Sequence, residues 1–282
     1  MLMKSEKNIV RCLQCARVIM LIVTSVAASS IPVAVHAQTT LYAITSYGNL
    51  YEIDKASGNG TFIGYSGFGA NAAASDSQNR IITGGGSSAG ADLLVQVDPN
   101  TGTGSPYLTL ANRPGGFGIR GLAFNSSDEL FALMSKADTS AIDILTKINT
   151  TTGQVSLVGT NGETEMTGIQ GLAFDGSDNL FGVNSRTLVE ISTSTAVASA
   201  VGGFNITPDE QALEFDMDGT LYSARVNLKT IDPSGNASLV GATGIGNIRG
   251  LAIIPEPASF CLLVLGGIVA SGYGIGSRKA QS

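Results

Sequence analysis

Cysteine, histidine and tryptophan are nearly absent from this sequence. Its 282 residues include three cysteines, one histidine and no tryptophan. Cys12, Cys15 and His36 lie near the N-terminus and Cys261 near the C-terminus, so residues 38–254 contain none of the three types. This middle part cannot form a disulfide bond, a thiolate or imidazole metal site, or a catalytic group of the Ser-His-Asp or Cys-His kind.

Basic residues are also scarce in the middle part. Of the 16 lysines and arginines, four lie in the first 37 residues and two in the last few, so ten remain. Of the 22 aspartates and glutamates, Glu6 and Glu256 lie outside the middle part, so twenty remain. With this acidic balance and no basic cluster in the sequence, we expect neither nucleic acid nor an anionic membrane surface as its partner.

A hairpin pattern in Ile169–Val183 is the unit around which the rest is organised. Two short apolar runs flank a polar segment, with Asp175-Gly176 at the expected bend. Its Gly-Leu-Ala-Phe segment recurs, with variations, at residues 71–74, 121–124, 171–174, 212–215 and 250–253. The apolar residues of this segment are consecutive, which is typical of strands covered on both faces.

A second motif alternates with the first and also occurs five times. It consists of Leu, two residues, Ile or Val, and then Asp, Asn or Ser, and it begins at Leu50, Leu94, Leu145, Leu188 and Leu228. A repeat of about 40–50 residues with about four short strands is typical of β-propeller blades. Helical periodicity is absent outside the two termini, which argues against a helical or βαβ fold.

The order of the two motifs predicts how the ring closes. The repeats begin on the second strand of a blade, Leu41–Thr45, and end on a lone first strand, Ile248–Ile254. The two incomplete ends add up to one blade. We therefore predict an all-β fold, a propeller of five four-stranded blades closed by pairing of the C-terminal strand with the N-terminal strands, which protects the strand edges.

The N-terminus carries an export signal. Met1–Ala37 has four basic residues, then the apolar run Val18–Ala28, and it ends at Val35-His36-Ala37, a small-x-small cleavage pattern before Gln38. We predict a helical signal peptide, residues 1–37, removed by signal peptidase. The alternative, a transmembrane anchor, is disfavoured because the apolar run is short.

The C-terminus carries a second targeting segment, residues 255–282. Pro255-Glu256-Pro257 is followed by the apolar run Ala258–Ile275 and then by Arg278 and Lys279. We expect the prolines to end strand pairing, so that the propeller spans residues 38–254. The apolar run has the length of a single transmembrane helix, with its basic end in the cytoplasm.

This three-part tail resembles the PEP-CTERM sorting signal of Gram-negative bacteria. The resemblance implies that Pro255, Glu256 and Pro257 are the recognition motif and that Arg278 and Lys279 are the stop, although an Arg-rich run is usual there. It also implies processing by an exosortase-type enzyme, membrane anchoring that is at least transient, and a place on the cell surface or in the exopolysaccharide or biofilm matrix. The repeat body loosely resembles secreted bacterial propellers with Leu-Tyr-x-Ile-Asp blades, which Leu50–Asp54 matches best.

Several carboxylates could carry chemistry. Asp216 and Asp218 open like a calcium loop but lack its later ligands, so a hairpin turn is the favoured interpretation, as it is for Asp175 and Asp178. Glu163 and Glu165 fit a solvated loop better than an acid–base pair. Two further glutamates, Glu210 and Glu214, flank the first strand of the fourth blade repeat. Glu214 replaces an alanine of the other repeats, and we expect it either to face the central channel or to form a salt bridge with a neighbouring blade.

Two functions remain open. The first is an exported, non-catalytic propeller that binds polysaccharide, a surface protein or itself, with no cofactor and no metal. The second is a secreted propeller hydrolase or lyase that uses carboxylates and a calcium ion. Three or more carboxylates converging on the central channel would favour the enzyme, whereas a channel lined by Ser, Thr and aliphatic residues would favour the binding module.

Overall fold

Twenty β-strands make up the part of the chain that the structure describes, and no helix occurs within it. The computed structural model describes residues 38–85, 92–136, 141–184, 186–204 and 210–256. In these residues, no helical segment is long and apolar enough to cross a membrane. The expected signal peptide with Val35 and Ala37, and the expected tail helix with Pro257, Arg278 and Lys279, lie outside them.

The strands form five antiparallel sheets of four strands each, as the repeats predict. Blade 1 contains β20 (Ile248–Pro255), β1 (Thr39–Thr45), β2 (Asn49–Ile53) and β3 (Gly60–Tyr65). Blade 2 contains β4 (Ala72–Ser75), β5 (Ile81–Gly84), β6 (Leu93–Val97) and β7 (Gly104–Thr109). Blade 3 contains β8 (Phe117–Phe124), β9 (Leu130–Lys136), β10 (Ile144–Ile148) and β11 (Val155–Leu157). Blade 4 contains β12 (Ile169–Phe174), β13 (Leu180–Asn184), β14 (Thr187–Ile191) and β15 (Ala198–Gly203). Blade 5 contains β16 (Ala212–Phe215), β17 (Leu221–Ala224), β18 (Asn227–Ile231) and β19 (Ala237–Ala242).

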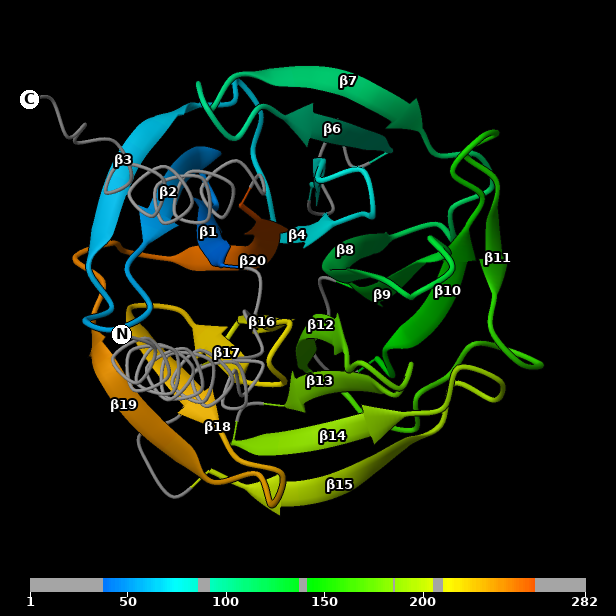
Figure 1. Cartoon of the computed structure of the whole chain (residues 1–282). Coiled ribbons are helices and arrows are strands. Elements are labelled where there is room, and N and C mark those ends of the chain that lie inside the picture. Colours follow the sequence, from blue (N-terminus) through cyan, green and yellow to red (C-terminus); the bar gives the residue numbers. More distant parts are fainter. Residues whose placement is uncertain (1–37, 86–91, 137–140, 185, 205–209, 257–282) are drawn as a thin grey trace, which may run out of the picture. The chain divides into compact units, whose positions relative to one another are not determined.

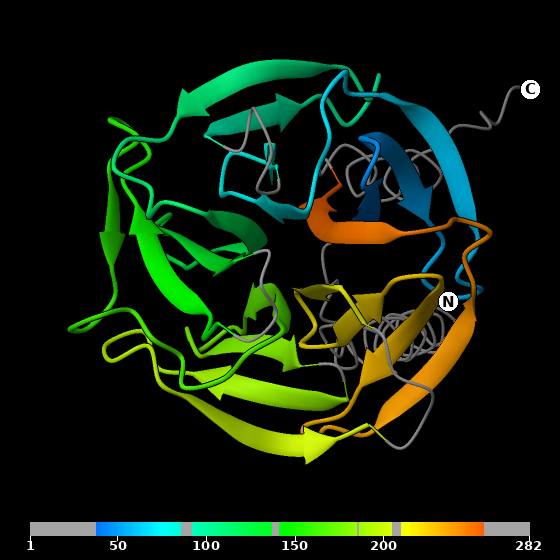
Figure 2. The ribbon, with the colours of Figure 1, turned by 180° about the vertical axis from the view of Figure 1, so that it is seen from behind.

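The five blades are arranged in a ring around a central axis (Figure 1). The first strand of each blade lies innermost, and each inner strand contacts the inner strands of both neighbouring blades, which completes the circle through β4, β8, β12, β16 and β20. The fourth strands form the rim, as the view from behind also shows (Figure 2). The fold is the predicted β-propeller.

Pairing of β20 with β1 closes the ring. The register joins Thr45 to Ile248 at one end and Thr39 to Pro255 at the other, with one irregularity near Thr45. The Glu256 amide then donates to the Gln38 carbonyl oxygen at 2.7 Å. The predicted closure is confirmed. The C-terminal strand ends at Pro255, one residue beyond the expected Ile254. Pro255 is accommodated because it is the last residue of the strand, where a missing amide donor costs little.

The loop between β12 and β13 shows how local polar groups shape the hairpins. The predicted hairpin is confirmed, and Asp175 and Gly176 lie in its bend, where the Asp178 amide donates to the Asp175 carbonyl oxygen at 3.1 Å. Five residues connect the strands, and Asp178 adopts the left-handed conformation at φ 62°. The Asp175 carboxylate accepts hydrogen bonds from the Ser177 and Asn179 amides at 2.9 and 2.8 Å. These bonds close the loop locally.

The hydrophobic core lies between the blades. In one cluster, Ala173 and Val183 of blade 4 pack with Leu213 and Leu221 of blade 5, and the other four clusters likewise join neighbouring blades. Each blade therefore depends on its neighbours to bury its apolar surface. This arrangement positions polar side chains at the two ends of the blades, where strands begin and end.

Candidate functional site

Small residues of the inner strands close the central axis. A Cβ atom on Gly250 would lie 2.3 Å from the Ala73 amide nitrogen, and one on Gly121 would lie 2.8 Å from the Leu172 Cγ. Glycine at these positions lets neighbouring strands approach closely. The remaining space is lined by glycine, alanine and leucine residues with Arg249, and it is too narrow for a water molecule. Three or more carboxylates, which would favour the enzyme, do not converge on this part of the axis, and the serine and threonine residues expected for a binding module do not line it either.

In the strand register, Glu214 occupies a position that is alanine in the other four inner strands: Ala74, Ala123, Ala173 and Ala252. The weak copy of the repeat therefore spans residues 72–75, one residue later than the sequence pattern indicated. It is partly buried, and within the described residues it makes no ion pair. Burial raises the pKa of its carboxyl group well above the usual range, and the nearby charge of Asp216 adds to this. Glu214 does not line the narrow space on the axis, so neither alternative expected for it is seen in the described residues. The ion pair with the neighbouring blade is formed by Asp216, whose Oδ2 lies 2.7 Å from Lys55 Nζ of blade 1.

The weak calcium candidates act as hydrogen-bond acceptors in turns. Asp216 accepts a hydrogen bond from the Thr39 hydroxyl at 2.7 Å in addition to its ion pair with Lys55. Asp218 accepts from the Thr220 amide at 2.9 Å. No cluster of three or more potential metal ligands occurs in the described parts of the chain. The position beside Asp216 that a cation would need is taken by the Lys55 ammonium group.

The other glutamates are separated by the fold. Glu163 and Glu165 are exposed, and the Glu163 carboxylate accepts a hydrogen bond from Asn161 Nδ2 at 2.7 Å, as a solvated loop would. Glu210 is buried, where it pairs with Lys229 and accepts from the Ser223 hydroxyl at 3.1 Å. These contacts assign Glu210 to a buried ion pair that joins the start of blade 5 to its own second and third strands.

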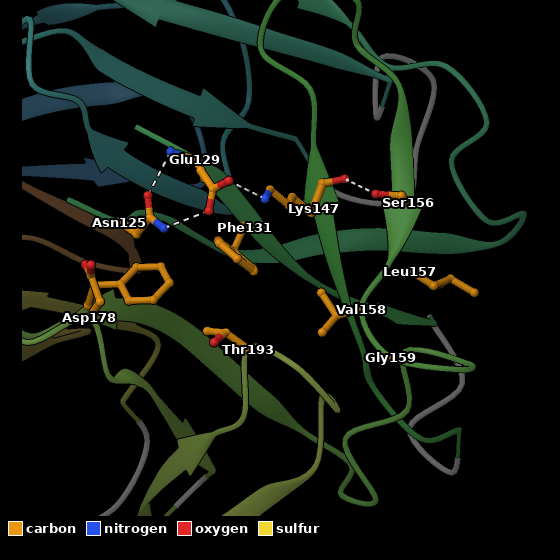
Figure 3. Close-up of a pocket in the computed structure, with 11 residues that line it drawn as sticks. Asn125, Glu129, Phe131, Lys147, Ser156, Leu157, Val158, Gly159, Asp178 and Thr193 are labelled. Carbon is orange, nitrogen blue, oxygen red and sulfur yellow. Dashed lines mark hydrogen bonds and ion pairs between the residues drawn. The ribbon is translucent and has the colours of Figure 1, made fainter. Parts of the chain in front are cut away.

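A polar pocket lies between blades 3 and 4 (Figure 3). It has a volume of about 300 Å³, which lies at the small end of the range for ligand pockets. Phe131 and Phe174 meet there edge to face, with ring centroids 5.3 Å apart. The lining is completed by polar and aliphatic side chains of both blades: Asn125, Glu129, Lys147, Ser156, Leu157, Val158, Gly159, Asp178 and Thr193.

The charged groups of the pocket are held by partners. Lys147 Nζ pairs with Glu129 and also lies 5.7 Å from the centroid of the Phe131 ring. Glu129 Oε2 accepts from Asn125 Nδ2 at 2.9 Å. Asp178 of blade 4 accepts from the Ser126 amide and hydroxyl of blade 3 at 2.8 and 2.6 Å, which ties the two blades together.

These partners lower the pKa of both carboxyl groups. The hydrogen bond from Lys147 is the main cause for Glu129, and the hydrogen bond from the Ser126 hydroxyl is the main cause for Asp178. Both groups are therefore ionised at neutral pH. Glycosidases need one carboxyl group that is protonated at the working pH, with its pKa raised by its surroundings. Neither carboxylate of this pocket meets that requirement.

Comparisons with known proteins show the fold alone. No protein-family model and no curated protein matches the chain. A symmetrical protein from a study of de novo evolutionary emergence matches with a TM-score of 0.53 and 15% identity, over 78% of this chain and 100% of its own. A chain of a nidogen/laminin complex matches with a TM-score of 0.51 and 10% identity, over 77% and 98%. A luciferin-regenerating enzyme matches with a TM-score of only 0.47 and 12% identity, over 78% and 74%. At such identities, the activity of a neighbour does not transfer to this chain.

Sequence reasoning missed the pocket between blades 3 and 4. One signal was available in the second motif, where the residue before Ile or Val is Lys147 in blade 3. The sister positions carry glutamate, glutamine or threonine: Glu52, Gln96, Glu190 and Thr230. A single cation at a position that is otherwise acidic or neutral marks blade 3 as different. Nothing in the sequence, however, pairs Lys147 with Phe174 of the next blade.

Proposed function

We propose that the protein is an exported, non-catalytic propeller that binds polysaccharide at the cell surface or in the extracellular matrix. The observation that carries this proposal is the chemistry of the pocket between blades 3 and 4. An aromatic pair lies next to amide, hydroxyl and charged groups. A sugar ring presents C–H groups on its faces and hydroxyl groups at its edge, so it needs both kinds of contact.

The size and charge of the pocket support a sugar ligand. A volume of about 300 Å³ accommodates one ring of a longer chain, with the remainder lying outside. The ammonium group of Lys147 is already neutralised by Glu129, so the pocket favours hydrogen-bonding ligands over small ions. Export to the matrix rests on the signal-peptide pattern and on the sorting-signal resemblance of the tail.

The alternative function, a hydrolase or lyase, has weaker support. Glu129 and Asp178 line the same pocket and could flank a glycosidic bond. Both have lowered pKa values, so neither supplies the proton that a leaving group requires at neutral pH. We therefore propose that the pocket binds a ligand and does not catalyse a reaction.

A binding assay with two variants tests the proposal. The protein is purified from the culture or surface fraction of its producer and titrated with the exopolysaccharide of the same cells and with oligosaccharides cut from it. Phe174→Ala and Lys147→Met should weaken binding at least tenfold, because they remove the aromatic contact and the fixed hydrogen-bonding groups. Lys55→Met, which removes an ion pair at another blade junction, should leave binding unchanged.

Two results would overturn the proposal. Equal loss of binding in Lys55→Met and Lys147→Met would show that the variants act through ring stability. If the protein releases new reducing ends from the polysaccharide and Glu129→Gln abolishes this release, the pocket belongs to a hydrolase.

A further inference from the structure

Five polar residues form a collar at one end of the axis. Each inner strand packs against its neighbour through a small residue, and the residue directly before it is polar in all five blades. These five residues are Asn71, Arg120, Gln170, Gln211 and Arg249. The inner strands all begin at this end of the ring, so the five positions lie in one layer. We call them the collar. The chain has no basic cluster in its sequence, yet the fold brings two collar arginines together from positions more than a hundred residues apart.

A third arginine reaches the same end. Arg225 lies between β17 and β18, and in an antiparallel blade that connection is at the end where the inner strand begins. Burial, together with the positive charges of Arg120 and Arg225, lowers the pKa of the Arg249 guanidinium group. The side chains of the two collar arginines are only partly exposed, so solvent screens the repulsion between Arg120 and Arg249 incompletely.

Two polar atoms at this end have no partner among the described residues. They are Arg249 Nε and Gln211 Oε1, both buried, and Gln211 is only 7% exposed. Among the described residues, Arg120 makes no hydrogen bond and no ion pair. A buried guanidinium N–H without an acceptor costs free energy, so the native state retains a strain that a bound acceptor would remove.

Two carboxylates of the described residues near this end do not fill this role. Asp143 is buried and accepts a hydrogen bond from the Ile169 amide at 2.7 Å. Burial raises the pKa of Asp143, while the charge of Arg120 acts in the opposite direction without reaching ion-pair distance. Glu210 is already paired with Lys229.

We propose that the collar is an oxyanion-binding site in which Arg120 and Arg249 hold a carboxylate or phosphate group at the mouth of the ring. Guanidinium groups match the geometry of both anions and bind them through paired N–H donors. A bound anion relieves the repulsion between the arginines and supplies an acceptor for Arg249 Nε. The site lies at the mouth of the ring, apart from the pocket between blades 3 and 4, and does not depend on saccharide binding there.

Calorimetric titration of the full-length protein tests this site with three probes. Inorganic phosphate represents a free anion, glucuronate represents the acidic sugar of an anionic polysaccharide, and glucose is the neutral control. We expect phosphate or glucuronate to bind and glucose not to bind at this site. The anion that binds more tightly identifies the source. Binding should weaken at least threefold between 50 and 500 mM NaCl, because salt screens the attraction between the anion and these partly exposed charges.

Variants separate an anion site from a structural role. Arg249→Gln and Arg120→Gln should each weaken anion binding at least tenfold. Arg186→Gln, which removes an exposed arginine between β13 and β14 at the same end of the ring, should change it less than twofold. Without ligand, Arg249→Gln should melt at the same temperature as the unmodified protein or higher, because it removes repulsion and an unpartnered donor.

Three results would overturn the proposal. They are the absence of phosphate and glucuronate binding, glucose binding that weakens in Arg120→Gln and Arg249→Gln, and unchanged anion affinity in both collar variants. A lower melting temperature of Arg249→Gln without ligand, together with anion binding that is unchanged in Arg120→Gln, would assign the arginines a structural role instead.

Discussion

Removal of β20 should open the ring and unfold the protein. A chain that stops after Asn247 lacks the inner strand of blade 1, whereas a control chain that stops after Pro257 keeps it and lacks only the tail. In the full chain, Ile248 and Leu251 are completely buried and Ile253 is 6% exposed. The pairing of β20 with β1 would also be lost, which would expose an unpaired strand edge.

The size of this effect follows from the burial. Each of the three aliphatic side chains contributes about 1.5–3 kcal/mol, so their loss removes about 5–9 kcal/mol as an upper estimate. Native domains have a total stability of about 5–15 kcal/mol. The chain that stops after Asn247 should therefore be unfolded or aggregated at 25 °C.

Urea denaturation followed by circular dichroism, together with size-exclusion chromatography, checks this prediction. The control that stops after Pro257 should be a monomer with the unfolding midpoint of the mature protein. If the chain without β20 is also monomeric and unfolds at the same urea concentration, ring closure does not hold the propeller together, and the reasoning from burial is refuted.

Three further predictions follow from particular residues. Gly250→Ala should lower the free energy of unfolding by about 2 kcal/mol or more, because the added Cβ would lie 2.3 Å from the Ala73 amide nitrogen; an unchanged urea midpoint would contradict the close approach of β20 and β4. Glu214→Gln should stabilise the protein by about 1–2 kcal/mol at pH 8 and hardly at all at pH 4, as measured by urea unfolding. The sign follows because burial raises the pKa of Glu214 in the folded state: below the unfolded pKa the group is protonated in both states, and stability falls as the pH rises from there through the folded pKa. Intact-mass analysis of the surface fraction should give a product from Gln38 to about Pro257, and a mass that includes Arg278 would show that the tail is kept as an anchor.

The sequence by itself determined the blades and their closure. Each hairpin is encoded locally, as in the loop where the Asp175 carboxylate accepts from amides two and four residues further along. The number of repeats then gives the number of blades. The incomplete blade at each end indicates that β20 pairs with β1. Such information is available from sequence because hydrogen bonds within a hairpin and the apolar pattern of a strand involve neighbours along the chain.

Only the tertiary structure decided which side chains meet. Glu214 and Asp216 are two residues apart, and the sequence does not tell that Asp216 reaches Lys55 of blade 1 while Glu214 makes no ion pair with any described residue. The pocket between blades 3 and 4 likewise joins Phe131 to Phe174, 43 positions apart, and the collar joins Arg120 to Arg249, 129 positions apart. The period of a repeat fixes the position of each strand in its blade, but the direction of each side chain depends on the twist and packing of the neighbouring blades. For this reason the arginines of the collar are scattered singly along the sequence and become neighbours only when the ring is closed.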